Sequence, residues 1–267
     1  MGRPALLISE TLLQTKLFFR STAAAFFTLV LPLMFLIMLN FFVPDTPGSA
    51  VSATQYITPA LAVFGMVTAT FTNLAINTSM ARDSGVLKRV AGTPLPMTIH
   101  LGGRILSAVM VGIISVGLML VVAWLLFGVE ISWSGMPLFA LLLVVGAATF
   151  SALGLAVAAI TPSARAAPAI ANFVILPLAF VSGIFFPLED APGWLQTVAS
   201  LLPLEPLATP AIAAFNPAVD STGFPWADLG KLVVWFAIGL AVAVRFFSYE
   251  PTTSASGRIR DAVTASD

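Results

Sequence analysis

Long apolar runs interrupted by short polar stretches dominate the chain. A helix needs about 20 mostly apolar residues to cross the hydrocarbon core of a bilayer. Five runs of that length contain no Asp, Glu, Lys or Arg, and a sixth, Leu232–Val244, reaches it with the flanking Lys231 and Arg245, whose long side chains can snorkel. We therefore predict an all-α, polytopic membrane protein with six transmembrane helices at about 21–43, 56–81, 105–128, 136–160, 166–188 and 229–248.

A short helix is predicted between the second and third spans. Asp83 or Ser84 suits its N-cap, Gly92 suits its C-terminal end, and Pro94 prevents its continuation. Between these residues, Val86, Leu87, Val90 and Ala91 form an apolar side, whereas Lys88 and Arg89 point elsewhere. Such a basic amphipathic helix either lies on anionic lipid headgroups or docks into a groove on a soluble partner.

The stretch before the last span contains two further helical patterns. They run at about Pro192–Leu202, starting at Asp190 and Pro192 and ending at Pro203, and at about Pro206–Phe215. Neither can cross a bilayer of roughly 30 Å at 1.5 Å per residue. Both are apolar, so we expect a re-entrant helical hairpin in the outer leaflet, with a plain interfacial loop as the alternative.

The distribution of charges predicts the orientation. Lys and Arg gather before span one, after spans two and four, and in the tail, and the alternate loops contain none, so both termini should be cytoplasmic. The formal net charge of zero then divides into eleven cations against five acids inside and Lys231 against seven acids outside. Trp133, Trp194 and Trp226 all fall on the outer side, as expected of an aromatic belt.

The composition excludes several classes of protein and several kinds of site. Only 9% of the residues are charged, which excludes a soluble globule and the basic footprint of a nucleic-acid-binding protein. The chain has no Cys and one His, no catalytic or metal-ligating set at membrane depth, and no GxxxxGK[ST] phosphate loop, so we expect no cofactor bound by this chain. Since the apolar runs of the six predicted spans contain no Asp, Glu, Lys, Arg or His for a proton relay, any energy for transport must come from a partner.

Uncharged polar residues remain in two spans. Thr70, Asn73 and Asn77 are spaced i, i+3, i+7 on one helical face, and Asn172 opens span five. The amides either hydrogen-bond between helices, as polar residues in membranes often do, or line a substrate route.

Two of these segments carry a resemblance to a known family. Asp83, Gly85, Leu87, Lys88 and Pro94 match an "acidic-x-Gly-x-Leu-basic-x-x-x-x-x-Pro" coupling stretch. A second signature lies within Leu176–Pro206, with the matching residues Pro177, Ser182, Gly183, Phe186, Pro187, Pro192, Trp194, Leu195, Leu202 and Pro203. The chain resembles membrane subunits of ABC type-2 exporters, particularly the bacterial daunorubicin-resistance-type permeases.

The resemblance implies a six-helix half-transporter that pairs with a second permease, either another copy or a related chain, and with cytoplasmic ABC ATPase subunits that bind ATP and Mg. By the same resemblance, Gly85, Val86, Leu87, Lys88 and Arg89 face the ATPase, an amphipathic helix spans about Pro4–Phe19, and spans two and five line the dimer interface. The outer hairpin residues are Pro192, Trp194, Leu195 and Pro203. We expect residues 1–250 to form one permease domain in the bacterial plasma membrane, in contact with membrane lipids, and residues 251–267 to form a flexible cytoplasmic tail.

The functional hypothesis is therefore a permease subunit that exports a drug-like or lipid-like amphiphile with ATP hydrolysed by a separate subunit. Three alternatives stay open: a stand-alone channel or secondary carrier, a lipid-modifying membrane enzyme, and a non-transporting anchor or sensor. The sequence names neither the cargo nor its direction of movement.

Overall fold

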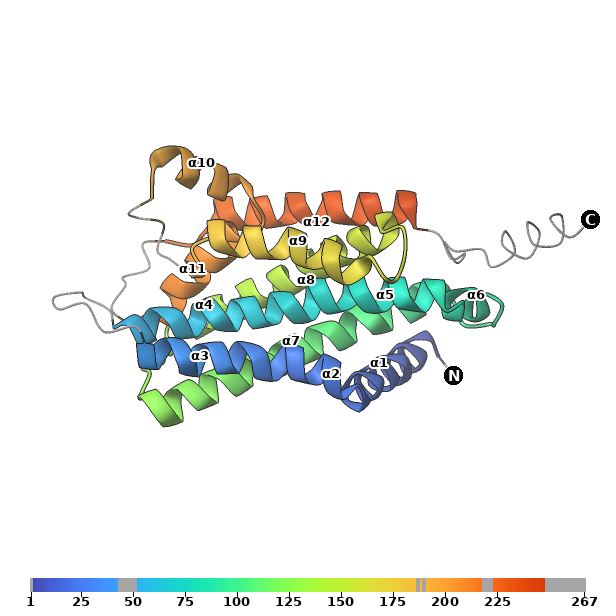
Figure 1. The fold of residues 1–267 in the computed structure, drawn as a ribbon, viewed down its shortest axis with the longest axis horizontal. Helices are drawn as coiled ribbons and strands as arrows, with labels where there is room; N and C mark the ends of the chain where they lie inside the picture. Colours follow the sequence, from blue (N-terminus) through green and yellow to red (C-terminus); the bar gives the residue numbers. More distant parts are fainter. Residues whose placement is uncertain (1, 43–51, 186–187, 189–190, 218–222, 248–267) are drawn as a thin grey trace, which may run out of the picture.

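The computed structural model describes residues 2–42, 52–185, 188, 191–217 and 223–247, and within these ranges every regular element is a helix. The helices run roughly parallel to one axis and form an elongated bundle (Figure 1). This confirms the predicted all-α class. The predicted tail, 251–267, and the signature residues Phe186 and Pro187 lie outside the described residues.

Five continuous helices are long and apolar enough to cross a bilayer in the described part of the chain. They are Thr22–Phe42, built from α2 (Thr22–Ala25), η1 (Phe26–Val30) and α3 (Leu31–Phe42); Ala53–Asp83, built from α4 (Ala53–Val67), η2 (Thr68–Thr72) and α5 (Asn73–Asp83); α7 (Met97–Phe127); α8 (Met136–Ile160); and α12 (Trp226–Phe246). The bounds of α8 agree with those predicted. The segments η1 and η2 are π-helical turns.

The predicted fifth span is shorter than expected. Its helix, α9 (Ala167–Val181), has 15 residues and a length of about 22 Å. The chain then turns at Gly183, which has a φ of +81°. The hydroxyl of Tyr56 on α4 donates a hydrogen bond to the Gly183 carbonyl, which fixes this turn against the bundle. The apolar run thus continues beyond the helix because the turn is itself packed inside the protein.

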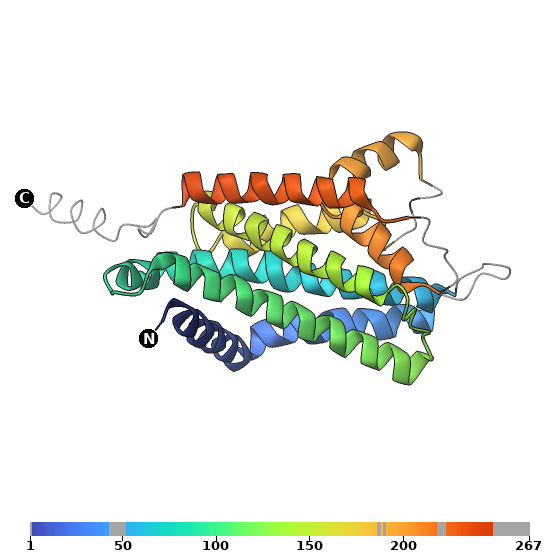
Figure 2. The ribbon, with the colours of Figure 1, turned by 180° about the vertical axis from the view of Figure 1, so that it is seen from behind.

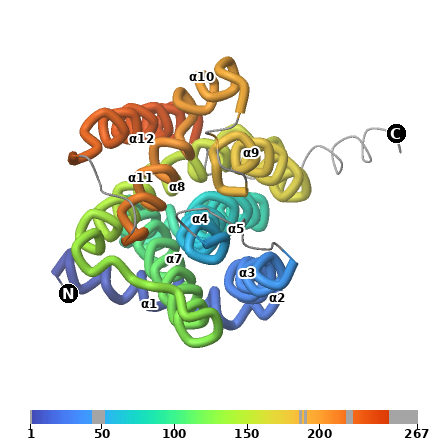
Figure 3. Tube along the Cα trace, turned by 90° about the vertical axis from the view of Figure 1, so that its left-hand side faces the viewer, coloured from blue at the N-terminus to red at the C-terminus, as the bar shows by residue number. Residues whose placement is uncertain are grey.

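The two predicted short helices are present as α10 (Gly193–Leu201) and α11 (Glu205–Phe215). They are bent by 98° at the break that contains Pro203, and as a pair they satisfy the span criteria as a broken span or re-entrant loop, which brings the candidate spans to six. α11 enters the bundle and packs on α8, α4 and α12, whereas α10 stays at its edge (Figure 3). A re-entrant hairpin was predicted from its length, and the bend agrees with it.

The second span and α8 form the centre of the bundle. Both are mainly buried, and the first and last spans are mainly exposed at its periphery. Seen from the opposite side, α8 runs beside α12, against which it packs, with α7 on its other side (Figure 2). The exposed residues of the peripheral spans are largely apolar, which is typical of a surface that faces lipid.

Two short helices lie at the end of the bundle that holds the N-terminus. α1 (Arg3–Arg20) runs across the bundle axis, and α6 (Val86–Ala91) follows the tip of α5 (Figures 1 and 3). Predicted Pro4–Phe19 thus corresponds to α1. The predicted inner segments meet at this end, and the hairpin and the α7–α8 connection lie at the other (Figure 1).

Close approach of α8 to η2 gives a direct test of this packing. A Cβ added at Gly154 would lie 2.7 Å from the carbonyl oxygen of Phe71, and backbone cannot move aside cheaply. Gly154→Ala should therefore lower the free energy of unfolding by about 1–3 kcal/mol and the thermal midpoint in detergent with it. Gly117→Ala on α7, where an added Cβ meets nothing within 4 Å, is the control. Equal midpoints for the two variants would contradict the α8–η2 contact.

Candidate functional site

The predicted coupling segment forms a sharp corner at the tip of the second span. α5 ends at Asp83, and Gly85, with a φ of +71°, is the N-cap of α6. Leu87 is completely buried, whereas Lys88 and Arg89 are exposed. The leucine therefore anchors the short helix and leaves its two cations facing solvent.

The predicted capping of α6 is wrong. Neither Asp83 nor Ser84 caps the helix, and no side chain in the described part of the protein bonds to its first amides. The carboxylate of Asp83 instead accepts a hydrogen bond of 2.5 Å from the backbone N–H of Ala164, in the turn after α8. Asp83 thus serves a contact that is distant in sequence, which local patterns do not reveal.

Arg82 reinforces the same contact. Its buried guanidinium donates to the carbonyl oxygens of Ala158, at 3.0 Å, and Thr161, at 2.6 Å, at the C-terminal end of α8. These carbonyls have no partners within the helix and carry the negative end of its dipole, so a cation suits them. The Nε atom lies 3.5 Å from Asp83. Arg82 and Asp83 together, the Arg82–Asp83 clamp, join the base of α6 to the α8–α9 turn.

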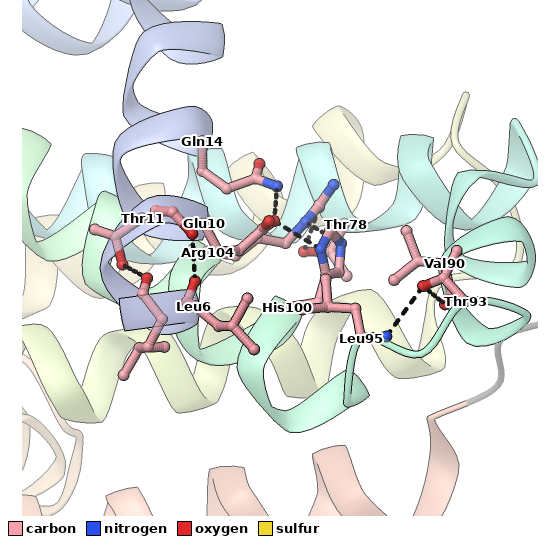
Figure 4. A network of polar contacts seen from close by, with 12 residues as sticks. Leu6, Glu10, Thr11, Gln14, Thr78, Val90, Thr93, Leu95, His100 and Arg104 are labelled. Atoms are coloured by element: carbon pink, nitrogen blue, oxygen red, sulfur yellow. Dashed lines mark hydrogen bonds and ion pairs between the residues drawn. The ribbon is translucent and has the colours of Figure 1, made fainter. Parts of the chain in front are cut away.

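A second polar cluster joins α1 to α7 (Figure 4). Glu10 on α1 is buried, and its Oε1 atom accepts hydrogen bonds from Gln14, at 2.7 Å, and from His100 Nδ1, at 2.8 Å. Arg104 Nε lies 3.2 Å from His100 Nε2. Because arginine has no acceptor, Nε2 accepts and Nδ1–H donates to Glu10, so the imidazole is neutral.

This cluster inverts the amphipathicity of α1. Its inward side presents Glu10, Thr11 and Gln14 to the protein, and a Cβ at Gly103 of α7 would lie 2.5 Å from Glu10 Cγ. The outward side exposes Ile8, Leu12, Leu13 and Phe19. This arrangement suits a helix whose outer surface contacts lipid.

A cavity of about 200 Å³ lies between α1, α2, α5 and α7. Its polar lining consists of Gln14, Ser21, Asn73, Asn77, Arg104 and Ser107. Its apolar lining consists of Leu17, Phe18, Ala24, Leu74, Ala108 and Val111. The side chains of Asn73 and Asn77 hydrogen-bond to each other at its wall.

The structure does not bring the four predicted route residues together. Asn73 and Asn77 line the cavity, but Thr70 is buried and donates to the Met66 carbonyl at 2.9 Å. A π-helical turn changes the number of residues per turn, so the register predicted across Thr70 and Asn73 is lost at η2. Asn172 is exposed on α9, apart from the cavity lining.

The predicted hairpin residues occupy distinct positions. Pro192 is the N-cap of α10, Trp194 is 69% exposed, Leu195 is half-buried and Pro203 is buried in the break before α11. The indole of Trp235 on α12 donates to the Leu201 carbonyl at 3.0 Å, which ties α10 to the last span.

The part of the chain that the structure describes has no group of three or more His, Cys, Asp or Glu arranged to hold a metal ion. Residues 8–215 match the family model for the ABC-2 type transporter. The chain belongs to the ABC-2 type transporter family. A search of the curated proteins found no match.

The match confirms the predicted ABC type-2 family. The chain is therefore a permease component of an ABC transporter in a membrane. Family membership also implies an ABC ATPase as partner and, in many members, a dimer of permeases. The match covers the ABC-2 type as a whole, so the daunorubicin-type subfamily stays a prediction.

The residues that sequence reasoning missed are Arg82, Glu10, His100 and Arg104. The structure places His100 and Arg104 inside α7, which begins at Met97 rather than near Ile105. Hydropathy finds the part of a helix that lies in lipid, and a helix end outside the lipid gives no such signal. The sequence shows these four residues only as ionisable groups beside apolar runs, and it does not indicate which groups they contact.

The Arg82–Asp83 clamp predicts a large effect of one substitution. Arg82→Ala removes charge-assisted hydrogen bonds and leaves the α8 carbonyls unsatisfied, which should cost about 1.5–3 kcal/mol of stability. Thermal unfolding of the purified protein in detergent measures it. Arg165→Ala, which removes an exposed arginine at the same end, should leave the midpoint close to wild type. A similar small change for both variants would contradict the clamp.

Proposed function

We propose that this permease exports a drug-like or lipid-like amphiphile from the cytoplasmic side, with ATP and Mg bound by a separate ATPase that docks on α6. The observation that carries the proposal is the corner at Gly85, which exposes Lys88 and Arg89 at the end of a buried span in a chain of the ABC-2 type family.

The docking surface consists of the exposed side of α6. Leu87 points into the protein, so the cations and the neighbouring backbone would meet the ATPase, and Gly85, Val86 and Leu87 would hold the helix in position. A solvent-facing cation pair suits an acidic rim on a partner, since complementary charges steer association. Assigning this end to the cytoplasm follows from its excess of Lys and Arg.

The Arg82–Asp83 clamp supplies a mechanical link from α6 to the membrane part. It bonds the base of α6 to the last turn of α8 and to the start of the α8–α9 turn. Movement of α6 with the ATPase would therefore pull on α8, the central helix of the bundle. Such coupling requires two arrangements of the bundle that bind the ATPase differently.

An amphiphilic cargo agrees with the surfaces that the structure offers. The cavity beside α1 combines polar and apolar lining, and α1 and η1 next to it expose large apolar side chains such as Phe19, Phe26 and Phe27. A cargo that enters from the inner leaflet would meet these helices first. Efflux and a role in antibiotic resistance belong to the same proposal.

A second permease, either another copy or a related chain, would pack on α9. This helix exposes Asn172 in an otherwise apolar surface that includes Phe173, at 80% exposed, and Phe180. An amide facing hydrocarbon is costly, and a helix–helix contact would satisfy it.

Affinity purification in mild detergent tests the docking surface. Wild-type permease should retain an ABC ATPase, and Lys88→Glu combined with Arg89→Glu should reduce the amount recovered at least about tenfold, because two favourable charge contacts become repulsive. The control is Lys16→Glu with Arg20→Glu, which changes charge equally on α1, where both residues are also exposed.

Equal ATPase recovery from both double variants would contradict docking on α6. Complete absence of an ATPase from the wild-type purification, together with transport by the reconstituted permease alone, would favour the stand-alone carrier instead.

The dimer contact is tested by disulfide cross-linking. The chain has no cysteine, so Asn172→Cys introduces a single thiol. Oxidation in membranes should yield a cross-linked dimer if two copies meet at α9, and Ser134→Cys, exposed at the α7–α8 connection, should yield none. Cross-linking only through Ser134→Cys would contradict the α9 interface.

A further inference from the structure

We infer that the cavity beside α1 binds the acidic headgroup of a membrane amphiphile, with Arg104 as the residue that contacts the anion. The inference extends the proposed function to a specific ligand chemistry, but binding itself requires no ATPase.

Arg104 is a cation at the wall of the cavity. Its guanidinium lines the cavity, and Nε and Nη1 donate to His100 and to the Asn77 carbonyl, both at 3.2 Å. Among the described residues, no ion pair joins Arg104 to a carboxylate, and Nη2 makes no hydrogen bond. The nearby Glu10 carboxylate attracts Arg104 but hydrogen-bonds to His100 and Gln14 and not to Arg104. A largely buried cation without a direct ion pair is unfavourable, and an anionic ligand would offset that cost.

The lining and the size of the cavity suit an acidic headgroup. Amide and hydroxyl groups of Gln14, Ser21, Asn73 and Ser107 lie along its lining with Arg104, and these groups suit the oxygens of a phosphate or carboxylate. The remaining lining is apolar, as the first carbons of a chain require. A volume of about 200 Å³ is below the roughly 300–1,000 Å³ of pockets for drug-sized ligands, so it fits a headgroup and not a whole molecule.

The position of the cavity along α7 indicates its level in the membrane. α7 has 31 residues and a length of about 46 Å, which exceeds the roughly 30 Å hydrocarbon core. Its far end is exposed and apolar through Trp124, Leu125 and Leu126, so the excess length lies at the Met97 end. Arg104 is about 10 Å from that end. The cavity therefore lies at the level of the headgroups, next to the lipid-facing side of α1.

Two sources share this chemistry: a resident acidic phospholipid and an acidic amphiphilic cargo. The probe for both is dioleoylphosphatidylglycerol, with dioleoylphosphatidylcholine as the matched lipid of no net charge. Delipidated permease is incubated with each lipid, and the lipid retained per protein is measured by mass spectrometry. Wild type should retain phosphatidylglycerol at least about tenfold better, as expected for a charge-assisted contact.

Variants identify the site. Arg104→Gln should abolish the preference while keeping a donor for the Asn77 carbonyl, and Arg104→Lys should restore much of it. Ala24→Leu fills the apolar part of the cavity with Arg104 intact, and should lower retention without lowering the thermal midpoint. Arg165→Gln removes an exposed cation at the same end and should retain the preference. An unchanged preference in folded Arg104→Gln would overturn the inference, as would displacement of the lipid by inorganic phosphate, since a free anion would then suffice.

The source is identified with the reconstituted complex. ATP-dependent movement of fluorescent phosphatidylglycerol would indicate a cargo, and retention without movement would indicate a resident lipid; both outcomes support the site. Absence of an ATPase in the purification would count against the proposed function and leave this binding result standing. Normal ATPase recovery with retention independent of Arg104 would instead overturn the site alone.

Discussion

The structure depends on keeping charge out of hydrocarbon. A charged side chain at the centre of a bilayer is strongly disfavoured, and a chain with 9% charged residues has few to place. The described charges lie in α1, at or near the ends of the other helices or in the connections, and most of the large side chains exposed along the spans are apolar. At the N-terminal end, several charges are buried, and each buried one has a defined polar partner.

The polar groups at this end form two clusters with different contacts. Arg82 and Asp83 fasten the corner that precedes α6 to the end of α8, so the exposed cations of α6 are rigidly connected to the central helix. Glu10 and His100 fasten α1 across the bundle and leave Arg104 at the wall of a small cavity. The first cluster suits transmission of movement from a cytoplasmic partner. The second suits recognition of an anion at the membrane surface. They lie on neighbouring helices, α5 and α7, which also meet through the bond from Arg104 to Asn77.

Sequence patterns predicted what depends on local hydropathy and on helix-breaking residues. Met136–Ile160 is an uninterrupted apolar run and folds as one helix with those bounds, and Pro203 separates α10 from α11 as expected. The length of α9 was wrong because the turn at Gly183 is apolar and packed, so hydropathy alone extends the span. Thr70 does not line the cavity that Asn73 lines, and the π-helical turn that contains Thr70 has no clear mark in the sequence.

The candidate site was less predictable for a related reason. The short helix near Lys88 was visible as an amphipathic pattern between breakers, but the partners of Asp83 and Glu10 are 81 and 90 residues away. A carboxylate near a helix start is normally assigned as a cap, because that is the local option. Only the packing of α8 and α7 against the span ends reveals that both acids serve tertiary contacts instead.

Docking of a cytoplasmic ATPase requires that α6 face the cytoplasm, where the ATPase can reach it. Labelling with a membrane-impermeant maleimide tests this directly, since single-cysteine variants of a cysteine-free chain carry no background. Ser84→Cys, exposed beside α6, should react only after the cells are permeabilised, and Ser134→Cys, exposed at the opposite end, should react in intact cells. Labelling of Ser84→Cys in intact cells, with protection of Ser134→Cys, would contradict the account.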